Sequence, residues 1–433
     1  MNKTFTIQTL GCKVNQYESE AIAWRLKKSG FSPKNQNASY AIINTCTVTQ
    51  KAGMQSRQLI RQTIRKHPDA TIIVTGCHAQ ISPKDIQDIQ GVHWIVGHAY
   101  KHELPQRIQN HALPQKRNSQ QILISDILHH TTYDHMPLDS LQNRSRPTIK
   151  IQDGCNAFCS YCIVPYARGP SRSLSQNNVV DMVKRFRDNR YQEVILTGIH
   201  LGMYGHDLSP PIQLTHLLNK ILQIHDCPRI RLSSIEPLEI TDDLIQMIKE
   251  SPKMCHHLHI PLQSGDDNTL KQMNRHYTPG FFYDLIHKIH ASIPDIAIGI
   301  DVLIGFPTET QQAFENTLSL LDNVPACYFH VFPFSLREGT GIAKQKIKLD
   351  IQTIKTRAKM IRDLGGQKRI NFYQSSIGQK QWVIVESSDS SQSHGLTGNY
   401  IPVKIPGSFH KNDMIHVQLK GAASVNEMRG ELI

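Results

Sequence analysis

Six short runs rich in β-branched and apolar residues occur between positions 148 and 334, with helix-like segments between them. Parallel strands need a long crossover between them, and this crossover is usually a helix. The alternation therefore predicts a parallel α/β architecture, either a doubly wound sheet or a barrel that stops short of eight units. We expect strands at 148–152, 193–197, 229–233, 256–260, 297–303 and 328–334, and helices at 178–190, 214–224, 242–250, 283–293 and 311–321.

The first hundred residues show the same alternation on a smaller scale. Strand-like runs at 5–10, 40–44 and 71–75 are each followed by helix-like sequence, such as 18–29 and 51–67. This pattern predicts an open parallel sheet covered by helices. A polar stretch at about 110–146 has little periodic order and is predicted to be a linker with a strand or two.

The last sixty or so residues change character. After a helix predicted at 351–372, strand-like runs at 381–386, 397–404 and 414–420 are joined by Ser, Gly, Asp and Asn, with no helix between them. This pattern predicts a small antiparallel barrel or sandwich. The expected organisation is therefore an N-terminal domain at 1–112, a linker at 113–142, a central domain at 143–374 and a β-barrel module at 375–433.

Composition places the chain among globular proteins. Of its 433 residues, 39% are hydrophobic and 19% are charged, and no run approaches the ~20 apolar residues that span a bilayer. The first residues lack the apolar stretch of a secretory signal, so a cytoplasmic location without a membrane is expected. The formal net charge of +12 favours an anionic partner, for which nucleic acid is the commonest choice.

Three of the nine cysteines share one context, since Cys12, Cys46 and Cys77 each close a predicted strand and precede a helix. Disulfides rarely persist in the cytoplasm, so metal binding or catalysis is the favoured use of clustered cysteines. The carboxyl ends of parallel strands meet at one edge of a sheet, so these three thiols are expected to converge. Converging thiolates suit a metal or an iron–sulfur cluster, and zinc with His78 as a fourth ligand is an alternative.

A second group, Cys155, Cys159 and Cys162, follows the first strand of the central series with the spacing C-x-x-x-C-x-x-C. Three thiolates at this spacing wrap around a compact inorganic core, and on a 4Fe–4S cluster they leave one iron open. A structural zinc site usually has a second cysteine or histidine pair, and none follows here. The remaining cysteines, Cys227, Cys255 and Cys327, stand singly and are expected in the core.

The triplet, with Tyr161 before its last cysteine, resembles the radical S-adenosylmethionine (SAM) superfamily. That resemblance implies a partial (β/α)6 barrel, and a cluster whose open iron binds SAM and generates a 5′-deoxyadenosyl radical. More of the chain resembles the methylthiotransferase branch of the superfamily. The similar segments surround Cys12, Cys46 and Cys77 and include His259–Gly265, Met273–Arg275, Asp301–Thr310 and Ser335–Thr340, while the C-terminal module resembles a TRAM barrel.

The resemblance implies a transferase with two 4Fe–4S clusters and SAM as cofactors. One cluster, on Cys155, Cys159 and Cys162, would generate the radical, and the auxiliary one, on Cys12, Cys46 and Cys77, would hold or supply sulfur. It also implies a reductant protein, such as a flavodoxin or ferredoxin. Candidate SAM contacts at the strand ends are Tyr161, Gly198, Ser234, Glu236, His259 and Gln263.

The run Lys13-Val-Asn-Gln-Tyr-Glu18 after the first cysteine resembles the branch that acts on threonylcarbamoyladenosine at tRNA position 37. Segments 196–202 and 398–403 favour the same branch. Its product would be 2-methylthio-N6-threonylcarbamoyladenosine. The alternative substrates are isopentenyladenosine in tRNA and an aspartate of a ribosomal protein. Alternatives outside this family are a two-cluster electron carrier and a zinc- or cluster-bearing RNA-binding protein.

For the tRNA, Arg57, Arg61 and Arg65 recur every four residues on one predicted helix and form a basic stripe suited to phosphate contacts. A merely solvated helix face is the alternative interpretation. The C-terminal module is not basic, because residues 375–433 contain five Lys or Arg and five Asp or Glu. A role in RNA binding there would depend on shape rather than on net charge.

Overall fold

The computed structural model describes residues 3–110, 120–138, 144–345, 349–424 and 426–433. These residues form two compact units. Unit 1 comprises Met1–Leu138, Gln152–Leu174 and Ser335–Ala343, and unit 2 comprises Asp139–Ile151, Ser175–Phe334 and Lys344–Ile433. The cysteine triplet therefore belongs with the N-terminal residues. The units do not follow the predicted domain boundaries, and residues 113–119 and 139–142 of the predicted linker lie outside the described residues.

Unit 1 contains a six-stranded parallel sheet in the order β2-β1-β3-β4-β5-β6. The three predicted strands are β1, β3 and β4, and the region predicted as linker contributes the edge strand β6. The sheet strands are β1 Thr4–Thr9, β2 Ser32–Pro33, β3 Tyr40–Thr45, β4 Thr71–Gly76, β5 Trp94–Val96 and β6 Gln121–Leu123.

Helices of unit 1 follow the strands along the chain. They are α1 Lys13–Lys28, α2 Gln50–Lys66, α3 Cys77–Ile81, α4 Pro83–Gln87, the 3-10 turns η1 His98–Glu103 and η2 Ile127–His129, α5 Leu104–Gln109 and α6 Val164–Arg168. Helix α1 begins five residues before its predicted start, because Val14 and Tyr17 already continue its buried face. All six residues of β3 are buried, as expected for a strand covered on both faces.

The centre of unit 2 is a row of parallel strands in two three-stranded sheets, β11-β10-β7 and β12-β13-β14. Isolated parallel bridges, Ile230 to Met254 and Ser234 to His259, join β11 to β12. The predicted partial barrel of six strands is therefore confirmed. The strands are β7 Thr148–Lys150, β10 Glu193–Thr197, β11 Arg229–Leu232, β12 His257–Gln263, β13 Ala297–Ile304 and β14 Tyr328–Pro333.

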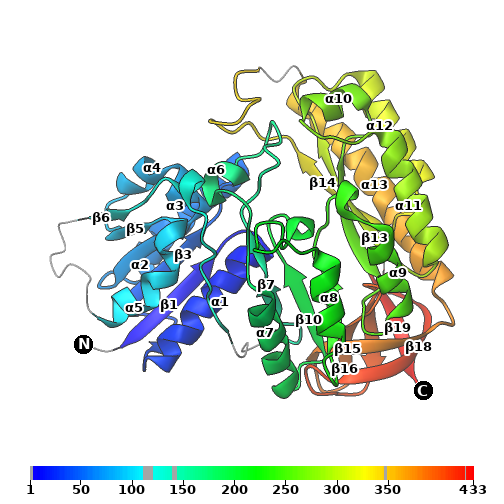
Figure 1. Cartoon of the computed structure of the whole chain (residues 1–433), viewed down its shortest axis with the longest axis horizontal. Coiled ribbons are helices and arrows are strands. Elements are labelled where there is room, and N and C mark those ends of the chain that lie inside the picture. Colours follow the sequence, from blue (N-terminus) through cyan, green and yellow to red (C-terminus); the bar gives the residue numbers. More distant parts are fainter. Residues whose placement is uncertain (1–2, 111–119, 139–143, 346–348, 425) are drawn as a thin grey trace. The chain divides into compact units, whose positions relative to one another are not determined.

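Helices α7, α8, α9, α11 and α12 alternate with these strands along the chain and lie along them in Figure 1. Their bounds are α7 Gln176–Asp188, α8 Leu214–Leu222, α9 Asp242–Glu250, α11 Pro279–Ser292 and α12 Gln311–Asn323, with the short α10 at Asp267–Gln272. The long α13, Ile351–Ser375, packs against β14 and leads into the C-terminal module. Among the described residues, no helix combines the length and the apolar character that a membrane crossing requires.

The C-terminal module is a closed five-stranded barrel, drawn in orange and red in Figure 1. Its strands are β15 Lys380–Ser388, β16 Gln392–Thr397, β17 Pro402–Pro406, β18 Met414–Ser424 and β19 Glu427–Leu432. The single strand predicted at 397–404 is wrong, because a turn through Tyr400, at φ +63°, separates β16 from β17. The barrel is mixed rather than purely antiparallel, since β17 pairs with β19 in parallel.

Buried charges attach this barrel to the central strands. Arg229 and Arg231, on β11, donate to Glu193 on β10. Arg231 also donates to the backbone carbonyls of Thr397 and Gly398 at the end of β16. Burial alone would raise the pKa of Glu193, but the two guanidinium groups lower it to about 2, so the carboxylate is charged at neutral pH. Unit 2 therefore contains both the partial barrel and the C-terminal barrel as one compact body.

Candidate functional site

Three cysteines follow the carboxyl ends of adjacent strands in unit 1. Strands β1, β3 and β4 are neighbours in the sheet, with Thr9 opposite Asn44 and Thr45 opposite Gly76. Cys12, Cys46 and Cys77 come just after these ends. The structure therefore brings together at one sheet edge three thiols that are spread over 65 positions of the sequence.

Two glycines allow the backbone to turn sharply in front of these cysteines. Gly11 has φ +103° and Gly76 has φ +96°, a region that side chains with a Cβ rarely occupy. A Cβ added at Gly76 would lie 2.3 Å from the carbonyl oxygen of Thr45, and one added at Gly11 would lie 3.1 Å from the sulfur of Cys46. Both positions therefore require the absence of a side chain, and the short Gly11 contact shows how closely the loop before Cys12 approaches Cys46.

The first cysteine group combines one exposed and two buried thiols. Cys12 is exposed, while Cys46 and Cys77 are buried. Burial raises the pKa of the Cys46 thiol, and it raises that of Cys77 to about 12. Metal ions deprotonate coordinating thiols outright, so cluster binding would supply the thiolates that burial disfavours.

His78 does not join the thiols as a fourth ligand. Its Nδ1 contacts Thr47 Oγ1 at 3.1 Å, and its Nε2 lies 4.0 Å from a carboxylate oxygen of Asp85. Burial lowers the pKa of its imidazole to about 4. Zinc would hold its sulfur ligands roughly 3.8 Å apart, given Zn–S bonds of about 2.3 Å. Within the described chain, the one group of three ligand atoms lying within 4.8 Å of one another includes neither His78 nor a cysteine.

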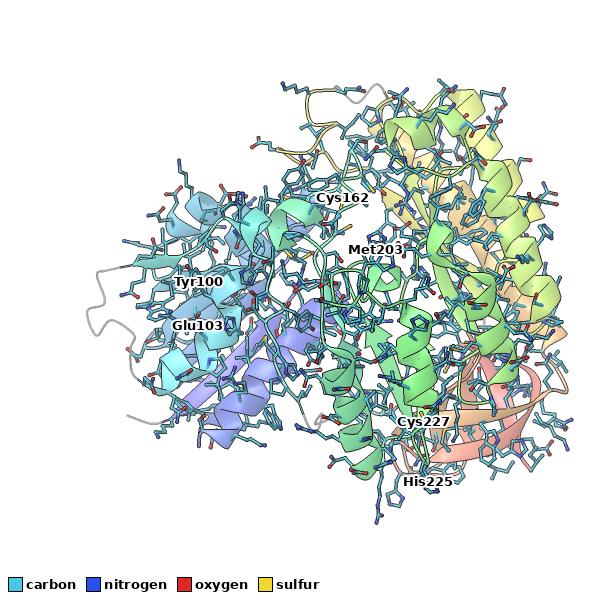
Figure 2. All side chains as sticks on the ribbon, viewed as in Figure 1. Tyr100, Glu103, Cys162, Met203, His225 and Cys227 are labelled. Carbon is cyan, nitrogen blue, oxygen red and sulfur yellow. The ribbon has the colours of Figure 1, made fainter. Side chains whose placement is uncertain are left out.

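The second cysteine group lies on the loop between β8, Gln152–Asp153, and α6. Cys155, Cys159 and Cys162 are all half-buried, and Figure 2 labels Cys162 where the loop meets α6. The backbone N–H of Ala157 donates to the sulfur of Cys155 at 3.4 Å, and that of Cys162 donates to the carbonyl of Cys159 at 2.9 Å. Hydrogen bonds to ligand sulfurs are among the factors that set the potentials of iron–sulfur clusters.

Other parts of unit 1 hold this loop in place. The strand β9, Arg172–Ser173, pairs with β8, and α6 packs against α3, the helix that begins at Cys77. The segment Ser335–Ala343 contacts residues next to both cysteine groups. The N–H of Ile342 donates to the carbonyl of Ser160 at 2.8 Å, and Arg337 donates to Thr47 Oγ1 at 2.6 Å.

The donor chemistry of both groups fits iron–sulfur clusters. Each group offers three thiols, and none of the nine cysteines, all of them described, is in a disulfide. In neither group do all three sulfurs lie within 4.8 Å of one another, and a cluster, which is larger than a single ion, needs more widely spaced thiols. With three thiolates each, two clusters could bind, and each would have one iron without a cysteine ligand.

The remaining cysteines are core residues, as predicted. Cys227, Cys255 and Cys327 are buried, and burial raises the pKa of Cys227 and Cys255 to about 11 and that of Cys327 to about 12. Figure 2 shows Cys227 beside His225, in the connection between α8 and β11. None of the three lies in an ion-sized ligand group among the described residues.

Five of the six candidate SAM contacts belong to unit 2, where four follow or end a central strand and His259 lies within β12. Gly198 follows β10, Ser234 and Glu236 follow β11, and His259 and Gln263 are on β12. Tyr161 belongs to unit 1, on the loop of the cysteine triplet, where it is half-buried.

Several of these side chains already have protein partners. Ser234 Oγ contacts His259 Nδ1 at 2.5 Å, and both guanidinium nitrogens of Arg275 donate to the carboxylate of Glu236. Gln263 has φ +67° and ends a register shift in β12. Irregular strand ends of this kind are frequent next to active sites.

Sequence reasoning did not identify the residues that support these contacts. Tyr277 donates to the carbonyl of Leu262 at 2.7 Å, beside the bulge, and also contacts Arg275. Asp301 and His330, on β13 and β14, form with His259 the group whose ligand atoms lie within 4.8 Å of one another. Burial would raise the pKa of Asp301, but the two imidazoles lower it to about 2. Asp301 lies in one of the segments that resemble the family, where it was given no role. No local pattern marks Tyr277 or His330, because their contacts form only in the folded chain.

The basic stripe lies on α2. Arg61 and Arg65 are exposed, whereas Arg57 is half-buried and lies 3.5 Å from a carboxylate oxygen of Asp85. The opposite face of the helix, with Gly53, Ser56, Ile60 and Thr63, is buried. The structure thus places the stripe on the outer face of α2, with part of the charge of Arg57 compensated.

Two segments of the chain match known families. Residues 149–321 match the Radical SAM superfamily, and residues 4–97 match the Uncharacterized protein family UPF0004. The match to the first family includes the cysteine triplet, and the match to the second includes Cys12, Cys46 and Cys77.

Relatives with similar sequences span nearly the whole chain. It is 36% identical over 422 residues to the threonylcarbamoyladenosine tRNA methylthiotransferase MtaB of Bacillus subtilis, covering 95% of this chain and 92% of the relative. The MtaB protein of Rickettsia prowazekii is also 36% identical, with 95% of each chain covered. A tRNA-2-methylthio-N(6)-dimethylallyladenosine synthase of Clostridium botulinum is 31% identical, covering 91% of this chain and 88% of the relative.

Among solved structures, a radical SAM methyltransferase, TsrM from Kitasatospora setae, has a similar fold. The TM-score is 0.57 at 14% identity, covering 79% of this chain and 77% of that one. At this identity the likeness concerns the arrangement of helices and strands alone.

Proposed function

The chain belongs to the radical SAM methylthiotransferase family, and from this premise we propose that it methylthiolates N6-threonylcarbamoyladenosine at tRNA position 37. The product is 2-methylthio-N6-threonylcarbamoyladenosine. The observation that carries the proposal is similarity to MtaB proteins over 95% of the chain. Dimethylallyladenosine enzymes also match, at lower identity, so an isopentenyl substrate is the second candidate.

The six cysteines would hold two 4Fe–4S clusters. Cys155, Cys159 and Cys162 would hold the one that reacts with SAM, and Cys12, Cys46 and Cys77 the auxiliary one. When bound, these groups and SAM supply the radical, the sulfur and the methyl group that an unreactive aromatic C–H bond requires. The protein's own contribution is to hold the thiols at fixed positions, through the glycine turns before Cys12 and Cys77 and the hydrogen bonds of the triplet loop.

The SAM contacts are proposed to be Tyr161, Gly198, Ser234, Glu236, His259 and Gln263. Gly198 has no side chain, so a ligand can approach its backbone closely. Arg275 would orient the carboxylate of Glu236, and Ser234 would fix the ring of His259. These partners preorganise the polar groups, which lowers the ordering cost when a ligand binds.

For the tRNA, we propose phosphate contacts from Arg57, Arg61 and Arg65 on α2, with the C-terminal barrel as a further contact surface. The exposed Arg61 and Arg65 would contribute most, because Arg57 already faces Asp85. Lys13, next to Cys12, is a candidate partner for the carboxylate of the threonylcarbamoyl group. A reductant protein such as a flavodoxin or ferredoxin would supply the electrons.

The substrate is tested by incubating anaerobically reconstituted enzyme, SAM and a reductant with two tRNAs. One tRNA carries threonylcarbamoyladenosine and the other isopentenyladenosine, and nucleosides are quantified by mass spectrometry. We expect the methylthio product from the first tRNA alone. A product from only the isopentenyl tRNA would overturn the substrate assignment while leaving the chemistry in place. Modification of a ribosomal protein and of neither tRNA would overturn the RNA assignment as well.

A further inference from the structure

Arg168, the last residue of α6, is one of the largest fully buried side chains of the protein, with 1% of its surface exposed. Its guanidinium group donates to three side chains. Nη1 lies 2.7 Å from Asp153 Oδ1 and 2.9 Å from Glu18 Oε1, and Nη2 lies 2.5 Å from Asn15 Oδ1. Burial alone would lower the pKa of this group, but the carboxylates of Asp153 and Glu18 raise it well above its usual value, so it stays charged.

The partners of Arg168 come from the chain segments that flank both cysteine groups. Asp153 precedes Cys155 by two residues and Arg168 follows Cys162 by six, so the contact between them closes the triplet loop at both ends. Arg172 reinforces this closure by donating to the carbonyl of Arg168 at 2.9 Å.

Asn15 and Glu18 lie at the start of α1, directly after Cys12. Asn15 also donates to the carbonyl of Leu10 at 2.8 Å, and to that of Thr45, the residue before Cys46, at 3.1 Å. The guanidinium group of Arg168 therefore binds Asp153, at the start of the triplet loop. Through Asn15 it is also linked to the residues that position Cys12 and Cys46.

This buried network carries one more positive than negative charge before any cluster binds. Lys101, on η1, donates to Glu18 at 2.6 Å, and Arg172 lies 3.8 Å from Asp153 Oδ2. Three cations, Lys101, Arg168 and Arg172, therefore face two carboxylates, Glu18 and Asp153. Through Asn15, Arg168 is linked to the residues that position Cys12 and Cys46. Coordinated thiolates would add negative charge on that side, where Arg168 is a fixed, water-excluded positive charge. Such charges influence a cluster more strongly in a buried site than in water.

Stability alone is a weak explanation for this arrangement. Buried ion pairs can often be replaced by apolar side chains with little loss of stability. The location of Arg168 between the two thiol groups is better explained by a functional need for fixed spacing and positive charge. On the basis of the proposed function, we propose that Arg168 is a positioning residue that holds the triplet loop against the start of α1 and raises the reduction potential of the auxiliary cluster.

The geometric role is tested on iron-free, full-length protein by hydrogen–deuterium exchange of the peptide that spans Cys155 to Arg168. Arg168→Lys and Arg168→Met should both exchange roughly tenfold faster there than the wild type, because neither side chain can bind Asp153, Glu18 and Asn15 together. Arg357→Met is the matched control, since it removes another buried arginine, paired with Glu309 in unit 2, and should leave this peptide unchanged. Unchanged exchange in Arg168→Lys would overturn the positioning role, even if Arg168→Met does not fold.

The electrostatic role is tested on the auxiliary cluster alone, in protein with Cys155, Cys159 and Cys162 changed to Ala. Its potential is followed by paramagnetic resonance during a redox titration. Arg168→Met should shift the potential to more negative values, whereas Arg168→Lys, which keeps the charge, and Arg357→Met should not. An unshifted potential in folded Arg168→Met would overturn this part of the inference alone. If the protein with an intact Arg168 bound no iron on Cys12, Cys46 and Cys77, the cluster assignment itself would fail, and the inference with it.

Discussion

At the scale of single residues, the turn before Cys77 illustrates how the backbone determines where a thiol can lie. Gly76 combines a positive φ with a position where a Cβ would overlap the carbonyl oxygen of Thr45 and the side chain of Asn44. A residue with a Cβ would have to distort β4 or its neighbour β3, and Cys77 and Cys46 directly follow these strands. A substitution at Gly76 would therefore displace a ligand cysteine as well as lower the stability of unit 1.

We expect Gly76→Ala to lower the iron bound by the first cysteine group and to destabilise unit 1. The positive φ alone costs on the order of 1–3 kcal/mol, and the overlap adds to it. The measurement is iron per chain in protein whose triplet cysteines are changed to Ala, together with thermal unfolding. Gly30→Ala is the control, since Gly30 also has a positive φ, +82°, but nothing lies within 4 Å of the added Cβ. Full iron content in Gly76→Ala would show that the turn tolerates a side chain.

At the scale of elements, α2 has one face for the cysteine site and another for solvent. Thr49 caps the helix by accepting a hydrogen bond from the N–H of Ala52. Ser56, on its buried face, accepts from the N–H of Cys46 and donates to its carbonyl oxygen. The outer face carries Arg61 and Arg65. A helix of this kind keeps a ligand loop in position while offering cations to an anionic partner.

We expect Arg57, Arg61 and Arg65, changed together to Gln, to weaken tRNA binding. Each lost phosphate contact lowers the slope of log affinity against log salt by roughly 0.7–0.9, and about two are expected to be lost because Arg57 faces Asp85. Binding is measured over a range of salt concentrations. Changing Lys355, Lys359 and Arg362 on α13 to Gln removes the same charge elsewhere and should affect the slope less. Equal slopes for the α2 variant and the wild type would mean that this face is only solvated.

At the scale of the whole molecule, all six candidate cluster ligands belong to unit 1. The two groups differ in how they are built. Cys12, Cys46 and Cys77 depend on three strand ends, whereas Cys155, Cys159 and Cys162 share one loop. A change in one group can therefore leave the other intact, provided that the network of Arg168 is undisturbed.

We expect the two groups to have separable roles in the reaction. Cys159→Ala should abolish SAM cleavage, whereas Cys46→Ala should retain some cleavage to 5′-deoxyadenosine but form no methylthio product. Each change should remove about four irons per chain, the content of one cluster. Both products are quantified by mass spectrometry, and Cys327→Ala, at a buried position outside both groups, serves as the control. Equal loss of cleavage in both variants, with both folded, would contradict this division.

Much of the architecture could be predicted from the sequence, because it is encoded locally. Strand β10 and helix α9 have the predicted bounds, and the other central strands begin or end within a few residues of them. The spacing of the triplet and the position of Cys12, Cys46 and Cys77 after apolar runs are also local patterns. The strand predicted at 397–404 was wrong because its residues have strand propensity on both sides of a turn at Tyr400, which only the closing of the barrel makes necessary.

The sequence by itself therefore determined the order of strands and helices, the family and the cysteines available as ligands. Tertiary structure alone decided which side chains support them. Arg168 meets Glu18 across 150 positions, and His259 meets Asp301 and His330 across neighbouring strands. Such contacts have no periodic signature, because they depend on how distant elements pack. Tertiary structure also decided that the triplet loop groups with the N-terminal sheet and not with the strands that follow it.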